Sequence, residues 1–171
     1  IVAALRLFET TCASSAVFPL VTTEVSPPAV LAHLEGGAVL DLPVGVPILA
    51  RSRFLIDQLA HRQPVPFGLN EPTPKVLFYN RYTQYLLELE RSQVTLLGER
   101  RPLLDIELGR AALVDMGMRW IVVHKSDYPP SQLPKVLRFL DLTAAVTHDG
   151  DGLRIYRLDP AVASVLPVAD R

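Results

Sequence analysis

The apolar residues of this chain follow two different spacings, which separate predicted strands from predicted helices. Short apolar runs bounded by turn residues predict strands at 2–10, 38–42, 119–124, 142–148 and 153–158. Apolar positions three and four residues apart predict helices at 28–34, 52–62, 79–90, 104–116 and 131–140. Ser26 before two prolines predicts the cap of the first helix, and Gly117 predicts the end of the fourth.

Strands that alternate with helices, followed by two final strands, define the expected fold class. Residues 149–152 (DGDG) separate the last two strands, and this composition is typical of a β-hairpin turn. We therefore predict an α/β fold, a layered sandwich with a mixed, partly parallel sheet that ends in a C-terminal β-hairpin and has helices packed on it. Residues 1–158 are predicted to form a single α/β domain, and 159–171 a proline-containing tail.

Composition narrows the class of protein. Hydrophobic residues make up 49% and charged residues 20% of the 171 residues, which is typical of a globular chain. The 17 basic and 18 acidic residues include no basic block, which argues against a nucleic-acid partner. The single cysteine, Cys12, excludes an internal disulfide and a cysteine-based zinc site. The chain opens at Ile1 with an apolar stretch and no methionine, and we interpret it as a piece of a longer protein.

One candidate site lies between the second predicted strand and the helix that follows it. Asp41 lies near the carboxyl end of that strand, where α/β folds place ligand-facing groups. His61 follows Asp57 by four residues, so both lie on one helix face, where the carboxylate would raise the histidine pKa or fix its tautomer. The structural alternative, which we favour, is a solvated acid–imidazole pair, or an Asp41 that caps a neighbouring backbone.

His124 is the second candidate, at the end of the strand 119–124 and before a polar loop, 125–127. A strand-end histidine that bonds the backbone is the simpler interpretation. The four histidines show no metal-binding spacing, and no glycine-rich phosphate loop is present, so we expect no metal and no cofactor. Asp41, His61 and His124 would together form the site of a free-standing soluble, cytoplasmic α/β enzyme.

The helix faces offer candidates for ligand binding rather than catalysis. Asp57, Gln58 and His61 share one side of the helix 52–62. Tyr82 and Tyr85 could stack on a sugar or a peptide, but their helical spacing favours a core stripe.

Four segments, taken in order, resemble the soluble C-terminal region of polytopic GT-C-type membrane glycosyltransferases and their uncharacterised relatives. These segments are 27–34 (PPAVLAHL), 37–43 (GAVLDLP), 58–68 (QLAHRQPVPFG) and 116–124 (MGMRWIVVH). The third ends within a "hook", which we define as residues 63–70, and it matches the family pattern through His61, Pro64, Val65 and Gly68. This chain departs from the family pattern at residues 51–54 and Asp57, which replace a run of tyrosines and threonines.

The resemblance implies a domain on the extracytoplasmic, periplasmic face of a membrane, carried by the transmembrane part of the same polypeptide. Such enzymes use a polyprenyl-phosphate sugar, and their catalytic acid lies in the membrane part, so no catalytic residue carries over to this chain. The resemblance implies a non-catalytic accessory domain that supports folding, positions the acceptor or recruits a partner, with a glycan or lipid-linked sugar as ligand. A third hypothesis is a protein-interaction module that uses residues 63–74.

Overall fold

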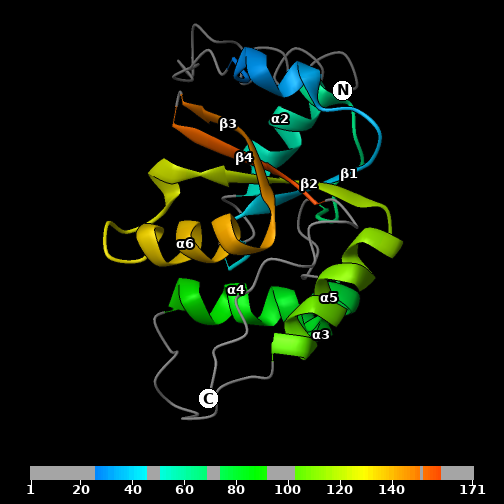
Figure 1. Cartoon of the computed structure of the whole chain (residues 1–171). Coiled ribbons are helices and arrows are strands. Elements are labelled where there is room, and N and C mark those ends of the chain that lie inside the picture. The colour runs from blue at the N-terminus through cyan, green and yellow to red at the C-terminus, as the bar shows by residue number, and fades with distance from the viewer. Residues whose placement is uncertain (1–25, 46–50, 69–73, 92–102, 151, 159–171) are drawn as a thin grey trace, which may run out of the picture.

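The computed structural model describes residues 26–45, 51–68, 74–91, 103–150 and 152–158, and its central element is a four-stranded sheet (Figure 1). The helices and strands, in chain order, are η1 (Ala29–His33), β1 (Ala38–Leu42), α2 (Ser52–His61), α3 (Lys75–Tyr79), α4 (Arg81–Arg91), α5 (Leu103–Asp115), β2 (Met118–His124), η3 (Lys125–Asp127), α6 (Leu133–Thr143), β3 (Ala145–Gly150) and β4 (Leu153–Arg157). The predicted strand 2–10 and the tail 159–171 lie outside the described residues.

The sheet is mixed and has the strand order β1-β2-β4-β3. β1 pairs with β2 in parallel, while β4 pairs with both β2 and β3 in antiparallel fashion. The predicted α/β class, with a partly parallel sheet and a C-terminal hairpin, is therefore confirmed. Because β1 and β2 are parallel and adjacent, their carboxyl ends lie at the same edge of the sheet.

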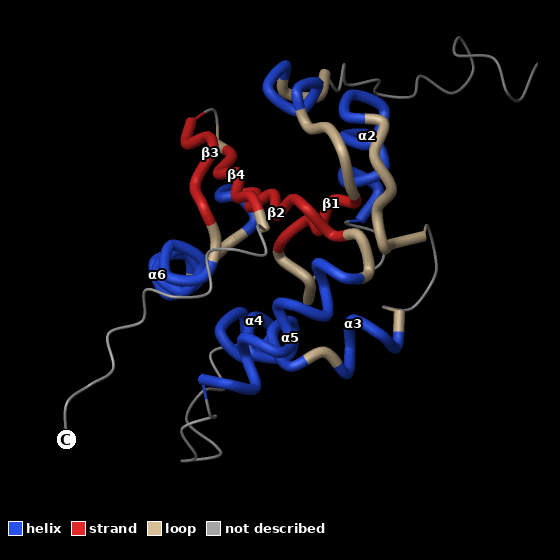
Figure 2. The backbone as a smooth tube through the Cα atoms, turned by 45° about the vertical axis from the view of Figure 1, so that its right-hand side comes forward, coloured by secondary structure: helices blue, strands red, loops and turns tan. Residues whose placement is uncertain are grey.

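Helical layers cover both faces of the sheet, as Figures 1 and 2 show. On one face Val39, Val122 and Ile155 pack with Leu31 and Leu34 from the η1 region. On the other face Leu40, Ile121 and Tyr156 belong to the larger core, which includes residues of α4, α5 and α6. Successive strand residues point to opposite faces, so Asp41 and His124 share the face of Val39 and Val122, on the side of η1 and α2.

Several predicted bounds differ from the structure. The helix predicted at 131–140 is α6, at 133–143, so the strand predicted at 142–148 begins only at Ala145. The first helix is a short 3₁₀ turn whose cap position is Pro28, with no side-chain cap bond from Ser26. The predicted helix 79–90 corresponds to α4, which begins at Arg81, because a separate helix that was not predicted, α3, ends at Tyr79 and Asn80 lies between the two. The Asn80 side chain accepts a hydrogen bond from the Thr83 backbone N–H (3.1 Å) and donates one to the Gly109 carbonyl (2.7 Å), so it caps α4 and ties it to α5.

Gly109 allows α5 to approach α4 closely. A Cβ at this position would lie 2.6 Å from the backbone nitrogen of Tyr82, which is closer than real contacts allow. At the other end of the domain, the predicted hairpin is confirmed, with Gly152 in a positive-φ conformation beside the turn. Within the described part of the chain, no helix is long and apolar enough to cross a membrane.

Candidate functional site

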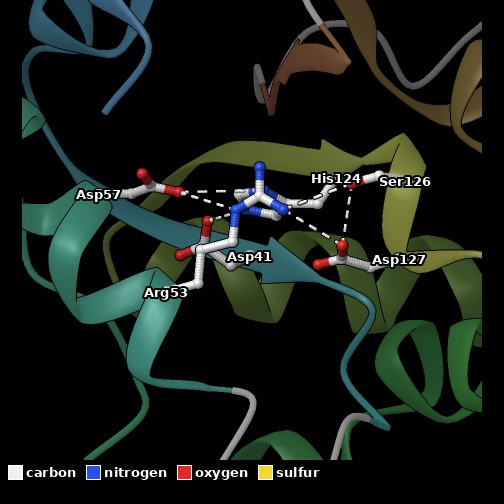
Figure 3. A network of polar contacts seen from close by, with 6 residues as sticks. All are labelled: Asp41, Arg53, Asp57, His124, Ser126 and Asp127. Carbon is white, nitrogen blue, oxygen red and sulfur yellow. Dashed lines mark hydrogen bonds and ion pairs between the residues drawn. The ribbon is translucent and has the colours of Figure 1, made fainter. Parts of the chain in front are cut away.

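Asp41 and His124 meet at the edge of the sheet where the two parallel strands end (Figure 3). Asp41 pairs in register with Val122, and His124 lies two residues further along β2, on the same face of the sheet. The His124 Nε2 donates a hydrogen bond of 2.9 Å to Asp41 Oδ1. Both side chains are fully buried. The parallel pairing of β1 and β2 thus joins an acid and a histidine 83 residues apart.

Helix α2 lies over this pair and adds a second carboxylate and an aromatic ring. Asp57 is buried, and its Oδ2 lies 3.9 Å from His124 Nδ1. The Phe54 ring stacks on the imidazole of His124, with centroids 5.1 Å apart and an angle of 28° between the planes. Phe54 and Asp57 are three residues apart in α2, so they lie on one helix face. That helix face covers the Asp41–His124 pair.

Arg53 covers the cluster from the solvent side. Its Nη1 donates to Asp127 Oδ1 (3.2 Å) and to Ser126 Oγ (3.4 Å), and its Nε lies 3.9 Å from Asp57 Oδ2. Figure 3 shows the guanidinium group in front of Asp41 and His124, between Asp57 and Asp127. Its side chain is 40% exposed. Arg53 therefore links α2 to η3 over the buried acid–histidine pair.

Gln58 and His61 hold the residues that follow α2. The Gln63 backbone N–H donates to His61 Nδ1 (3.0 Å), and Gln58 Nε2 donates to the Gln63 carbonyl (3.0 Å). Arg62 adopts the left-handed conformation that ends the helix. Because Nδ1 accepts a backbone hydrogen bond, the proton of a neutral His61 resides on Nε2. These contacts direct the described residues of the hook, 63–68, back toward the sheet, where the Pro64 carbonyl accepts a hydrogen bond from the Val39 backbone N–H.

The electrostatics of His61 differ from the sequence-based expectation. His61 is buried, and this burial lowers its pKa, with the nearby Asp41 acting in the opposite direction. The expected increase in pKa caused by Asp57 is therefore wrong. The solvated acid–imidazole alternative is also wrong, because Asp57 and His61 are both buried. A helical spacing of four residues shows that two side chains share a face, but not whether that face meets water.

This lowered pKa predicts that acid destabilises the fold through His61. The group is held neutral when folded, so its contribution to stability is complete above the unfolded pKa, about 6.5, and decreases as the pH falls below that value. We expect His61 to take up one proton on unfolding, so the free energy of unfolding should change with pH by at most about 1.4 kcal/mol per pH unit through this group. Urea unfolding between pH 7.5 and 5 measures the slope. His61→Asn should flatten it, whereas replacing the exposed His33 should not; equal slopes in all three proteins would contradict the prediction.

Burial dominates the electrostatics of Asp57 as well. It raises the pKa of this carboxyl group; Asp41 and Asp127 act in the same direction, and His124 and Arg53 oppose them. Within the described part of the chain, Asp57 Oδ2 and His124 Nδ1 are buried without a hydrogen-bond partner, and so are Asp41 Oδ2 and His61 Nε2. Unsatisfied buried polar atoms are uncommon in folded proteins. Four of them in one cluster mark this region as unusual.

The tyrosine candidates lie elsewhere. Tyr82 is fully buried, its hydroxyl group forms a 2.8 Å hydrogen bond with Thr143 Oγ1, and burial raises its pKa. Tyr82 and Tyr85 both contact the Phe139 ring of α6. Both tyrosines therefore pack in the core, as their helical spacing predicted.

The structure brings Asp41, Asp57, His61 and His124 together, but it places His33 on η1 and His148 on β3. Among the described residues, no three histidine, cysteine or acidic side chains have an arrangement that could hold a metal ion. Sequence reasoning missed that Arg53 and Phe54 belong to the cluster. The spacing of Arg53 and Asp57, four residues apart in a helix, was the signal that could have identified the former.

No known protein family matches this chain, and no curated protein or solved structure is significantly similar to it.

Proposed function

We propose that this chain is a non-catalytic accessory domain of a membrane-embedded glycosyltransferase-like protein. One observation supports this proposal: the segments that carry the resemblance pack into a single unit. The Val39 backbone N–H donates to the Pro64 carbonyl (2.9 Å), which joins the hook to β1. Leu31, Val65 and Val122 belong to one apolar cluster on this face of the sheet. The segments that resemble the family therefore pack against one another, as expected if the family shares them for a structural role.

The burial of the polar cluster supports a structural role over a catalytic one. Asp41, His61 and His124 are each at most 3% exposed. Their observed hydrogen bonds go to each other or to the hook, as in Asp41–His124 and Gln63–His61. A general base must reach the proton that it removes. In this arrangement the side chains instead hold β1, β2, α2 and the hook in fixed relation, and leave the surface of the domain to position an acceptor or recruit a partner.

The proposal places the domain on the extracytoplasmic face, attached to the transmembrane part of the same polypeptide. Expression of the complete gene with a tag after Arg171 tests this. The product should stay in the membrane pellet after a carbonate wash, and protease added to spheroplasts should remove the tag. A cytoplasmic protein expressed beside it is the control for intact cells. A carbonate-soluble product, or a tag protected from protease, would refute the proposal.

A free-standing α/β enzyme is the second candidate, and the observation that favours it is the position of the Asp41–His124 pair. The pair lies at the carboxyl edge of two parallel strands, where α/β enzymes gather catalytic groups. Under this proposal His124→Ala and His61→Ala abolish turnover on a substrate panel, measured at a temperature at which circular dichroism shows that both variants are still folded. Unchanged turnover in both variants, or no ligand-dependent shift in melting temperature across the panel, would count against it.

A further inference from the structure

A cavity lies at the carboxyl edge of the two parallel strands, on the side of α4. Its lining includes Pro43 and Gly45, which follow β1, Asp127 and Tyr128, which follow β2, and the last two residues of α4. Ligands of α/β proteins bind at this edge of the sheet. Helix α4 covers the face of the larger core, whereas the Asp41–His124 pair lies on the other face. Neither candidate function described above uses this cavity.

The volume of the cavity restricts its ligand to a small molecule. The volume is about 220 Å³. Because a protein cavity of about 150 Å³ holds a benzene molecule, this one admits a molecule of roughly nine non-hydrogen atoms.

Glu90 provides an acceptor at the inner side of the cavity. This residue is 8% exposed. Its Oε1 accepts two buried hydrogen bonds, whereas its Oε2 accepts, among the described residues, only the partly exposed bond from the Gly45 N–H. A carboxylate oxygen can accept two hydrogen bonds. Oε2 therefore keeps one acceptor position, on the side where Gly45 lines the cavity.

Charges of both signs line the cavity. Arg91 follows Glu90 in the chain and is exposed. Burial raises the pKa of the Glu90 carboxyl group, while its hydrogen bonds and the positive charge of Arg91 oppose this increase. Asp127 adds a second carboxylate, whose Oδ1 already accepts a hydrogen bond from Arg53. The lining thus combines a carboxylate at the inner side with a guanidinium group at the outer side.

An α-amino acid carries the two complementary charges on adjacent groups. Its ammonium group has three N–H donors, which can serve Glu90 Oε2 and the Asp127 carboxylate. Its carboxylate matches the planar guanidinium group of Arg91. A simple amine would leave Arg91 without a counter-charge, and a simple acid would meet Glu90. We propose that this cavity binds a free α-amino acid with a small, neutral side chain, with its ammonium group at Glu90 and its carboxylate at Arg91.

Titration of the complete chain with glycine, L-alanine, L-serine and L-glutamine at pH 7.5 tests the proposal, by calorimetry and by saturation-transfer NMR. Methylamine and acetate, which each carry only one of the two charges, are the comparison ligands. At least one amino acid should bind about ten-fold more tightly than either of them. The proposal is overturned if no amino acid binds at concentrations up to about 10 mM, or if methylamine or acetate binds as tightly. It requires neither the accessory-domain role nor turnover at the Asp41–His124 pair, so its failure would leave both of those tests unaffected.

Variants at the two sides of the cavity test the orientation of the ligand. Arg91→Met removes the positive charge from an exposed side chain, so it should weaken binding about ten-fold. Gly45→Ala retains the Glu90 charge but places a methyl group 3.2 Å from Oε2, so it should weaken binding as well. Melting temperatures confirm that both variants are folded.

Arg81→Met is the matched control, because it makes the same substitution at an exposed arginine at the start of α4. It should leave binding unchanged. Unchanged binding in Arg91→Met or in Gly45→Ala, or an equal loss in Arg81→Met, would overturn the proposed site.

Discussion

Replacing His124 with alanine is expected to lower the free energy of unfolding by about 3–5 kcal/mol. The substitution leaves the Asp41 carboxylate buried at 1% exposure without its 2.9 Å partner, and it removes the ring that stacks on Phe54. Removing one partner of a buried ion pair destabilises the fold by more than the intact pair stabilises it, because the remaining charge stays buried without compensation. Urea unfolding at pH 7.5, followed by circular dichroism, measures the loss.

A double variant separates the buried charge from the lost packing. Asp41→Leu combined with His124→Leu removes both members of the pair and fills the space with apolar groups, so it should be more stable than His124→Ala alone. His33→Ala, at an exposed histidine on η1, is the matched control and should change stability by less than about 0.5 kcal/mol. If His124→Ala costs no more than His33→Ala, the pair does not hold the two strand ends together.

Replacing Glu90 with alanine should cost a similar amount, about 3–5 kcal/mol, at a second buried acid. Glu90 Oε1 accepts hydrogen bonds from the Val44 backbone N–H (2.9 Å) and the Tyr128 hydroxyl group (2.8 Å), and Oε2 accepts one from the Gly45 N–H (2.8 Å). The carboxylate thereby binds the turn after β1 to α4 and to the loop after η3. Removing the carboxylate leaves these three donors without an acceptor, and the bonds from Val44 and Tyr128 are buried.

Tyr128→Phe measures one of these three bonds alone and should cost about 1 kcal/mol. Glu90→Gln keeps one carbonyl oxygen but turns an NH₂ group toward a backbone donor, so it should recover only part of the loss. Denaturant unfolding of the three variants under one set of conditions gives the comparison. A loss in Glu90→Ala no larger than in Tyr128→Phe would show that the carboxylate does not hold the turn.

Much of the secondary structure could be predicted from the sequence because its signals are local. The strand 38–42 has the predicted bounds, and the strand predicted at 119–124 begins only one residue earlier, at Met118. The separate helix α3 and the start of α4 at Arg81 could not be predicted, because the Asn80 side chain caps α4 while bonded to Gly109 of α5. That contact depends on helices packing, which no local pattern encodes.

The candidate site shows the same division. Asp41, His61 and His124 could be selected from the sequence as polar residues at strand and helix ends. Their mutual arrangement requires that β1 and β2 be adjacent and parallel, and that α2 lie on the face that Asp41 and His124 share. The direction of the His61 pKa shift could not be predicted without knowing that the side chain is buried. A nearby carboxylate raises a histidine pKa, whereas burial in a low-dielectric environment lowers it.

By itself, the sequence determined the bounds of β1, nearly those of β2, the approximate positions of α2, α4, α5 and α6, that the fold is α/β, and which polar residues lie near the ends of its elements. Only the tertiary structure decided that Asp41 and His124 bond across 83 residues, that Asp57 and His61 are buried rather than solvated, and that Arg53 covers them. The physical reason is that periodicity and turn chemistry act over a few residues, whereas strand order, register and burial arise when distant segments pack together.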